Sequence, residues 1–113
     1  MICFFRVNKQ KIQPFIKMAN KTGDLLISHG ALKHNIYYAN ELTGYQGTMG
    51  LLNLFEVEED EEVMLGQSIF KDQDHYHLVM KNTGSNDMVH YLNHHIKDII
   101  EIDKIISSKF KMV

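Results

Sequence analysis

The sequence contains few of the features that mark specialised classes of protein. Its single cysteine, Cys3, excludes an intramolecular disulfide, and we expect the thiol to serve as a small buried hydrophobe. No apolar run approaches the roughly 20 residues of a membrane-spanning helix, so no membrane partner is expected. The first residues lack the pattern of a secretory leader, so we expect a cytoplasmic location.

An excess of positive charge is also lacking. The chain has 12 Lys and Arg against 14 Asp and Glu, spread along most of its length. A nucleic-acid-binding protein usually shows a basic face or stripe, so no nucleic-acid partner is expected. The one dense charge run, residues 58–62, is acidic and indicates a solvated turn. A hydrophobic fraction of 44% over 113 residues predicts one soluble domain spanning residues 1–113.

Hydrophobic periodicity predicts an α+β fold. A strand at 1–7 precedes a helix that starts near residues 10–13, carries Pro14 in its first turn and stops at Gly30, with Gly23 as a weak point. The following elements are a strand at 32–39, a loop at 40–50, and a hairpin of strands 51–57 and 63–70. A helix capped by Asp72, a break at 82–84, a helix capped by Ser85 and an edge strand at 104–113 complete the chain. Strand, turn, strand and helix in this order predict a ferredoxin-like antiparallel sheet with helices on one face.

Four segments carry a resemblance to a known family. They are Lys17-Met18-Ala19, His29-Gly30-Ala31-Leu32, Glu61-Glu62-Val63, and the stretch from Phe70 through Met80 to Asn86-Asp87-Met88. With them the chain resembles small bacterial proteins grouped as domain of unknown function 1428, over residues 1–88 and again in the last strand. It departs from that pattern at Pro14, and at Ile105-Ile106-Ser107-Ser108, where the family has a glycine-rich strand.

The resemblance implies a dimeric α+β barrel, in which two sheets pack face to face across a twofold axis, so a homodimer is expected. The family has no established activity, so the resemblance defines no reaction. Our first hypothesis is a small-molecule-binding or accessory protein without a cofactor. The wider superfamily includes monooxygenases, isomerases and haem-degrading enzymes, whose ligands often lie between the sheet and its helices. The alternative is therefore a monooxygenase- or isomerase-like enzyme, cofactor-independent or haem-linked, acting on a small aromatic or lipophilic molecule.

Several polar side chains interrupt the predicted strands, where buried polar groups need partners. The candidate ligand-binding residues are His34, Tyr37, Asn53, Gln67 and His75. In the enzyme alternative, His34, Asn53 and Gln67 position the substrate, while Tyr37 or His75 donates a proton. In the structural alternative, these groups bond to one another, to water or across the dimer.

The last helix carries the one spacing that suits a metal ion. His90, His94 and Asp98 recur every four residues, and two imidazoles with a carboxylate can chelate a transition metal. This stripe lies opposite the apolar stripe that includes Leu92 and Ile96, so we expect a solvated face and no metal site. The sequence contains no Ser-His-Asp order, phosphate-binding loop or dinucleotide fingerprint.

Overall fold

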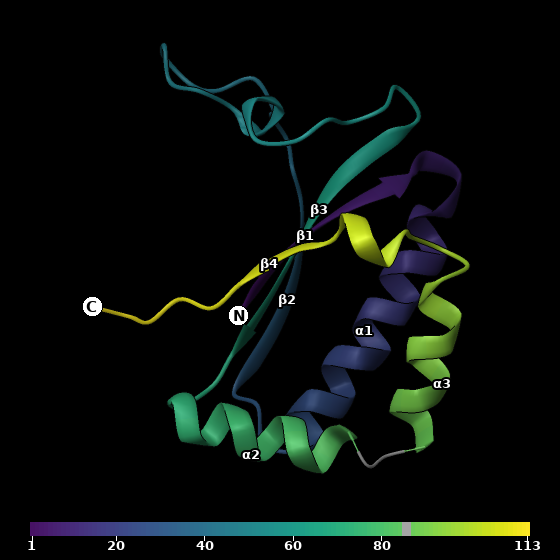
Figure 1. The fold of residues 1–113 in the computed structure, drawn as a ribbon, viewed down its shortest axis with the longest axis vertical. Coiled ribbons are helices and arrows are strands. Elements are labelled where there is room, and N and C mark those ends of the chain that lie inside the picture. The colour runs from purple at the N-terminus through teal and green to yellow at the C-terminus, as the bar shows by residue number, and fades with distance from the viewer. Residues whose placement is uncertain (85–86) are drawn as a thin grey trace.

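The computed structural model describes residues 1–84 and 87–113, which form one four-stranded sheet and three helices, with α1 and α3 on one side of the sheet and α2 across its end (Figure 1). The strands are β1 (Ile2–Asn8), β2 (Lys33–Tyr38), β3 (Glu61–Ile69) and β4 (Ile106–Ser108). The helices are α1 (Ile12–Ser28), α2 (Gln73–Gly84) and α3 (Asp87–Ile96). Short 3-10 turns lie at Lys9–Lys11, Leu51–Asn53 and Ile102–Lys104.

The strand order across the sheet is β2-β3-β1-β4, and every neighbouring pair is antiparallel. β1 and β2 therefore run in the same direction with β3 between them, and α1 connects them across one face. This arrangement is compatible with a ferredoxin-like fold. The predicted α+β class, with helices on one face of an antiparallel sheet, is confirmed.

Local chemistry accounts for both ends of α1. Pro14 lies in the first turn, where its missing N–H has no intrahelical partner to lose. The helix ends at Ser28, and Gly30, the predicted stop signal, follows two residues later with a φ of 115° that favours a residue without a Cβ atom. The next N–H, that of Ala31, donates to the carbonyl of Leu26 at 2.9 Å and satisfies one of the last free carbonyls.

Alternation along the strands divides the sheet into a helix-covered face and an open face. On the helix-covered face, a buried cluster joins both central strands to α1 and to the segment after α3, and it consists of Val7, Ile12, Phe15, Met64 and Ile100. The Phe5 ring adds to this cluster, with its centroid 5.0 Å from that of Phe15. A second cluster of Leu26, Ala31 and Val79 attaches α2 to the end of α1.

The predicted hairpin is wrong in its first half. Residues 51–57 form no strand, because Leu51–Asn53 make a 3-10 turn and residues 54–57 are irregular. β3 is already flanked on one side by β1 and on the other by β2, so no edge of β3 is free for residues 51–57. The predicted acidic turn is present, with Glu58, Glu59 and Asp60 exposed, but it leads into β3 from a loop.

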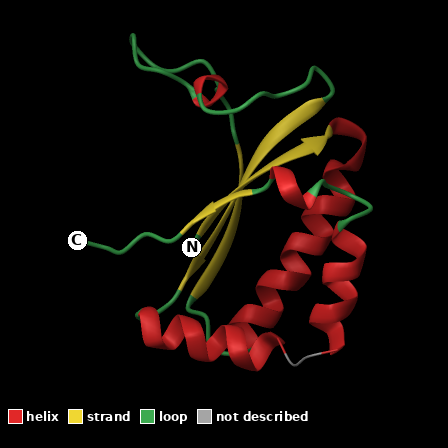
Figure 2. Cartoon of the chain, viewed as in Figure 1, coloured by secondary structure: helices red, strands yellow, loops and turns green. Residues whose placement is uncertain are grey.

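The long connection from β2 to β3 forms an arm, defined here as residues 40–54, which projects from the body (Figure 2). Its apolar side chains are strongly exposed, with 71% of Tyr45, 79% of Met49 and 74% of Leu54 accessible to solvent. The radius of gyration is 14.9 Å, against about 13 Å for a compact chain of this length. Connections this long without regular structure commonly serve a function.

The C-terminal part differs from the predictions in two places. The predicted break at 82–84 is helical, since α2 continues to Gly84, and the predicted cap at Ser85 lies outside the described residues. The edge strand is limited to Ile106–Ser108, and residues 109–113, called the tail below, are irregular and exposed. Within residues 1–84 and 87–113, no helix has the length and apolar content needed to cross a bilayer.

Candidate functional site

Three polar side chains meet on the open face of the sheet. Asn35 of β2 lies directly opposite Gln67 of β3, and its Nδ2 donates to Gln67 Oε1 at 3.3 Å. Tyr37 lies two residues along β2, and its hydroxyl donates to the same oxygen at 3.2 Å. Tyr37 reaches Gln67 along the diagonal between neighbouring strands, which long side chains can span. Two of the predicted candidates, Tyr37 and Gln67, are thus brought together with Asn35 as a polar triad.

The triad is surrounded by apolar side chains. On the same face, the strand register places Ile2 beside Gln67, and Phe4 between Leu65 and Ile106. No helix covers this face among the described residues, and 46% of Tyr37 and 40% of Ile106 are accessible. An apolar surface with a few convergent polar groups is the usual composition of a ligand site or of an interface core.

His34 lies on the opposite, helix-covered face, because it differs from Tyr37 by an odd number of residues. Its Nδ1 is 2.8 Å from Ser68 Oγ, while its Nε2 is buried without a partner in hydrogen-bonding geometry. Burial lowers the pKa of His34, and the Ala19 carbonyl and the Asp24 carboxylate act in the opposite direction. The charged ring needs an acceptor at both nitrogens, so the fold favours the neutral imidazole.

The His34 ring also explains the glycine in the middle of α1. A Cβ atom at Gly23 would overlap the Cδ2 and Cγ atoms of that ring. Glycine at position 23 lowers the helix propensity of α1, but it allows β2 to approach α1 closely. The sequence predicts Gly23 as a weak point in the helix, while the structure shows it as a packing requirement.

The remaining two candidates lie elsewhere and serve local roles. His75 caps the start of α2: its Nδ1 accepts from the Lys71 N–H at 2.9 Å, and its own N–H donates to Asp72 Oδ1 at 2.7 Å. Asn53 lies in the arm, where its Oδ1 accepts from the Gly50 N–H at 3.0 Å. The five predicted residues thus do not form one site: Tyr37 meets Gln67, whereas His34, Asn53 and His75 lie elsewhere.

Two surface hollows of about 450 Å³ each lie away from the triad. The first is formed by the arm and includes Glu41, Tyr45, Met49, Asn53 and Leu54. The second lies after α3 and includes Lys97, Ile100 and Asp103. Neither hollow includes His34, Tyr37, Gln67 or His75. The polar triad lies outside both hollows.

The candidate metal ligands of the last helix are solvated. His90 and His94 are exposed on α3, and Asp98 is exposed after its end, with its N–H donating to the His95 carbonyl at 3.0 Å. Among the described residues, no group of three or more His, Cys, Asp and Glu side chains is placed to hold a metal ion.

Burial raises the pKa of the Cys3 thiol, which disfavours the nucleophilic thiolate.

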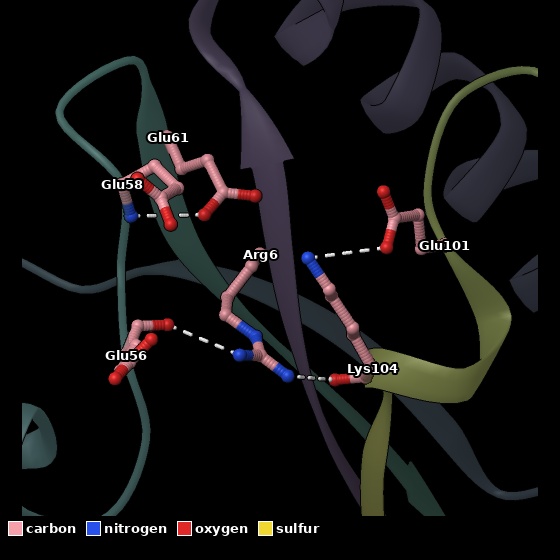
Figure 3. Close-up of polar contacts among 6 residues, drawn as sticks. All are labelled: Arg6, Glu56, Glu58, Glu61, Glu101 and Lys104. Carbon is pink, nitrogen blue, oxygen red and sulfur yellow. Dashed lines mark hydrogen bonds and ion pairs between the residues drawn. The ribbon is translucent and has the colours of Figure 1, made fainter.

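Arg6 is a structural residue that sequence reasoning missed. It projects from β1 on the open face and donates to the Glu56 carbonyl at 3.0 Å and to the Lys104 carbonyl at 2.6 Å (Figure 3). Its guanidinium also lies 5.3 Å from the centre of the Phe55 ring, which in turn contacts Phe4. Arg6 thereby fixes the base of the arm and the 3-10 turn before β4 to one strand. The run MICFFRV shows that a charged residue interrupts an apolar strand, but it does not indicate the partners of Arg6, which lie on other elements.

Comparison with known proteins adds no family. No protein-family model matches the chain, and no curated protein sequence matches it.

Proposed function

We propose that the chain is a homodimeric small-molecule-binding or accessory protein of the dimeric α+β barrel type, as its resemblance to domain of unknown function 1428 implies. The observation that carries the proposal is the open face of the sheet. An apolar surface there surrounds the Asn35, Tyr37 and Gln67 triad, while α1, with α3 packed beside it, lies on the other face. A second copy placed against this face removes its aromatic and aliphatic groups from water.

The triad supplies the hydrogen-bonding groups of the proposed binding site. Gln67 Oε1 already accepts two hydrogen bonds, so Gln67, Asn35 and Tyr37 are held in fixed relative positions. Fixed polar groups within an apolar surface suit a small, mostly apolar molecule that carries one or two hydrogen-bonding groups. The triad contains no carboxylate, imidazole or thiol, which favours binding over acid–base catalysis.

The test is native mass spectrometry of the purified, untagged protein. We expect a dimer that carries a reproducible added mass, because the proposed site lies at the interface. Gln67→Leu should retain the dimer and lose the added mass, while Gln13→Leu, an exposed glutamine on α1, serves as the matched control. A wild-type monomer would contradict the dimer, and a dimer without added mass would contradict the small-molecule role.

The enzyme alternative remains a prediction with one supporting observation, the buried and unpartnered Nε2 of His34. The ring is enclosed by Gly23 and Ser68, so this nitrogen does not fit a haem ligand that must reach an open site. Turnover of small aromatic substrates that disappears in His34→Gln and persists in His94→Gln would favour the enzyme over the binding protein.

A further inference from the structure

The open face of the sheet has ends of opposite charge. At the end where β3 begins, residues 56–62 contain six carboxylates, and Glu56, Glu58, Glu59 and Asp60 are exposed. We call residues 56–62 the acidic end. The cations beside it are Arg6, which binds two carbonyl groups, and Lys9. A third, Lys104, pairs with Glu101 at 3.1 Å. The acidic end therefore keeps an excess of negative charge.

Exposed lysines occupy the other end of the same face. Lys33 lies opposite Ile69, the last residue of β3, and Lys109 and Lys111 follow β4 in the tail. We call these three residues the basic end. The Lys109 ammonium lies 4.5 Å from the centre of the Tyr76 ring, which directs the start of the tail past α2. The two ends are separated by the length of β3, so opposite charges do not neutralise each other within one copy.

We propose that two copies pack open face against open face with a twofold axis that runs across the strands, so that each acidic end lies over the partner's basic end. This inference rests on the proposed dimer and specifies its orientation. A twofold axis along the strands would instead place like charges together, which is unfavourable at an interface. With the axis across the strands, the tail of each copy meets the acidic end of the other.

The strands of the open face are too small in area to form a stable interface alone, so the proposed dimer also includes the projecting arm and tail. Four strands of these lengths, spaced about 4.8 Å apart, present a footprint on the order of 400 Å². A stable interface buries about 800 Å² on each partner. The arm and the tail both project on the open side of the sheet, away from the helices (Figure 1). Their exposed apolar side chains, including Tyr45, Met49 and Phe110, supply the missing area.

The experiment reverses the charges at one end at a time and then mixes the variants. Lys109→Glu with Lys111→Glu gives an acidic tail, and Glu58→Lys with Glu59→Lys gives a basic turn. We expect each variant to dimerise at least about tenfold more weakly than wild type at about 50 mM salt. Lys17→Glu with Lys21→Glu, on the exposed side of α1, makes the same charge change as the tail variant and should not alter dimerisation.

The mixture separates a contact between copies from a contact within one copy. In a heterodimer of the two variants, the acidic tail meets the basic turn and the unchanged tail meets the unchanged turn. We therefore expect native mass spectrometry to show heterodimers in excess over both homodimers. The dimer dissociation constant of the wild type, measured by analytical ultracentrifugation, should also rise between about 50 and about 500 mM salt.

Two results would overturn this orientation while leaving the dimer in place. One is a wild-type dimer whose affinity changes neither with salt nor with charge reversal. The other is a random mixture of homodimers and heterodimers, which would show that tail and turn do not meet across the interface. A monomeric wild-type protein, by contrast, would contradict the proposed function itself.

Discussion

The two faces of the sheet are built from the same strands and differ in how completely they are covered. Val7 and Met64, on the helix-covered face, are fully buried against α1, whereas Tyr37 and Ile106, on the open face, keep 40% or more of their surface exposed. One face therefore holds the fold of the single chain together. The other carries apolar groups and a polar triad that a second molecule is needed to cover.

The largest expected difference between the faces comes from truncating neighbouring residues of β3. Met64→Ala removes a fully buried side chain and should lower the free energy of unfolding by about 2–5 kcal/mol. Leu65→Ala, on the open face, should cost about 1 kcal/mol or less when the protein is dilute. Urea unfolding at one low protein concentration measures both values. Equal losses for the two variants would contradict the assignment of the core to the helix-covered face.

A smaller effect is expected from the contact between Gly23 and His34. Gly23→Ala favours the helix by up to about 1 kcal/mol, but its methyl group overlaps the imidazole, so we expect a net loss of about 1–3 kcal/mol. Gly84→Ala is the control, because a Cβ atom at that helical position meets none of the described residues within 4 Å. The loss should shrink in a His34→Ala background, as a double-mutant cycle would reveal. Stabilisation by Gly23→Ala alone would contradict the contact.

The smallest effect concerns the pH dependence of stability on the helix-covered face. The folded-state pKa of His34 is lowered below its ordinary value of 6.5, so the unfolded chain binds more protons between the two pKa values. The contribution of neutral His34 is fully present above about 6.5 and is lost as the pH falls toward the lowered folded pKa. Thermal unfolding between about pH 7.5 and 5 should show this loss in wild type and in His94→Gln, and a weaker loss in His34→Gln. A wild-type pH profile identical to that of His34→Gln would contradict this contribution of His34.

Sequence patterns correctly predicted the elements for which the hydrophobic period and the residues at the ends indicate the same structure. β1, α1, β2 and β3 follow from apolar periodicity, from Pro14 near the helix start and from Gly30 at its end. The run at 51–57 has the same composition as a strand, yet the sheet has no free position for it beside β3. The place beside β3 is taken by β1, whose residues lie far away in the sequence. A local pattern within residues 51–57 therefore cannot reveal that it is occupied.

Sequence patterns indicated only in part which candidate residues lie together in the fold. Tyr37 and Gln67 do meet, whereas His34 faces α1, and the odd spacing between His34 and Tyr37 already implied opposite faces. His75 was separable too, since an aspartate three residues before it is the spacing of a helix cap. Gly23 and Arg6 were not recognisable as contact residues, because their partners lie on other elements.

The late position of β4 has a consequence for the chain during synthesis. β1 obtains its first neighbour when residues 61–69 are complete, but its other edge stays bare until residues 106–108 emerge. A bare edge next to a water-exposed apolar face is a template for pairing with other nascent chains. Ile106–Ser108 then cover only Ile2–Phe4, and the carbonyl of Lys104 binds Arg6 one turn earlier. Once these three residues have emerged, we expect the growing polypeptide to pair less readily with other chains along this edge.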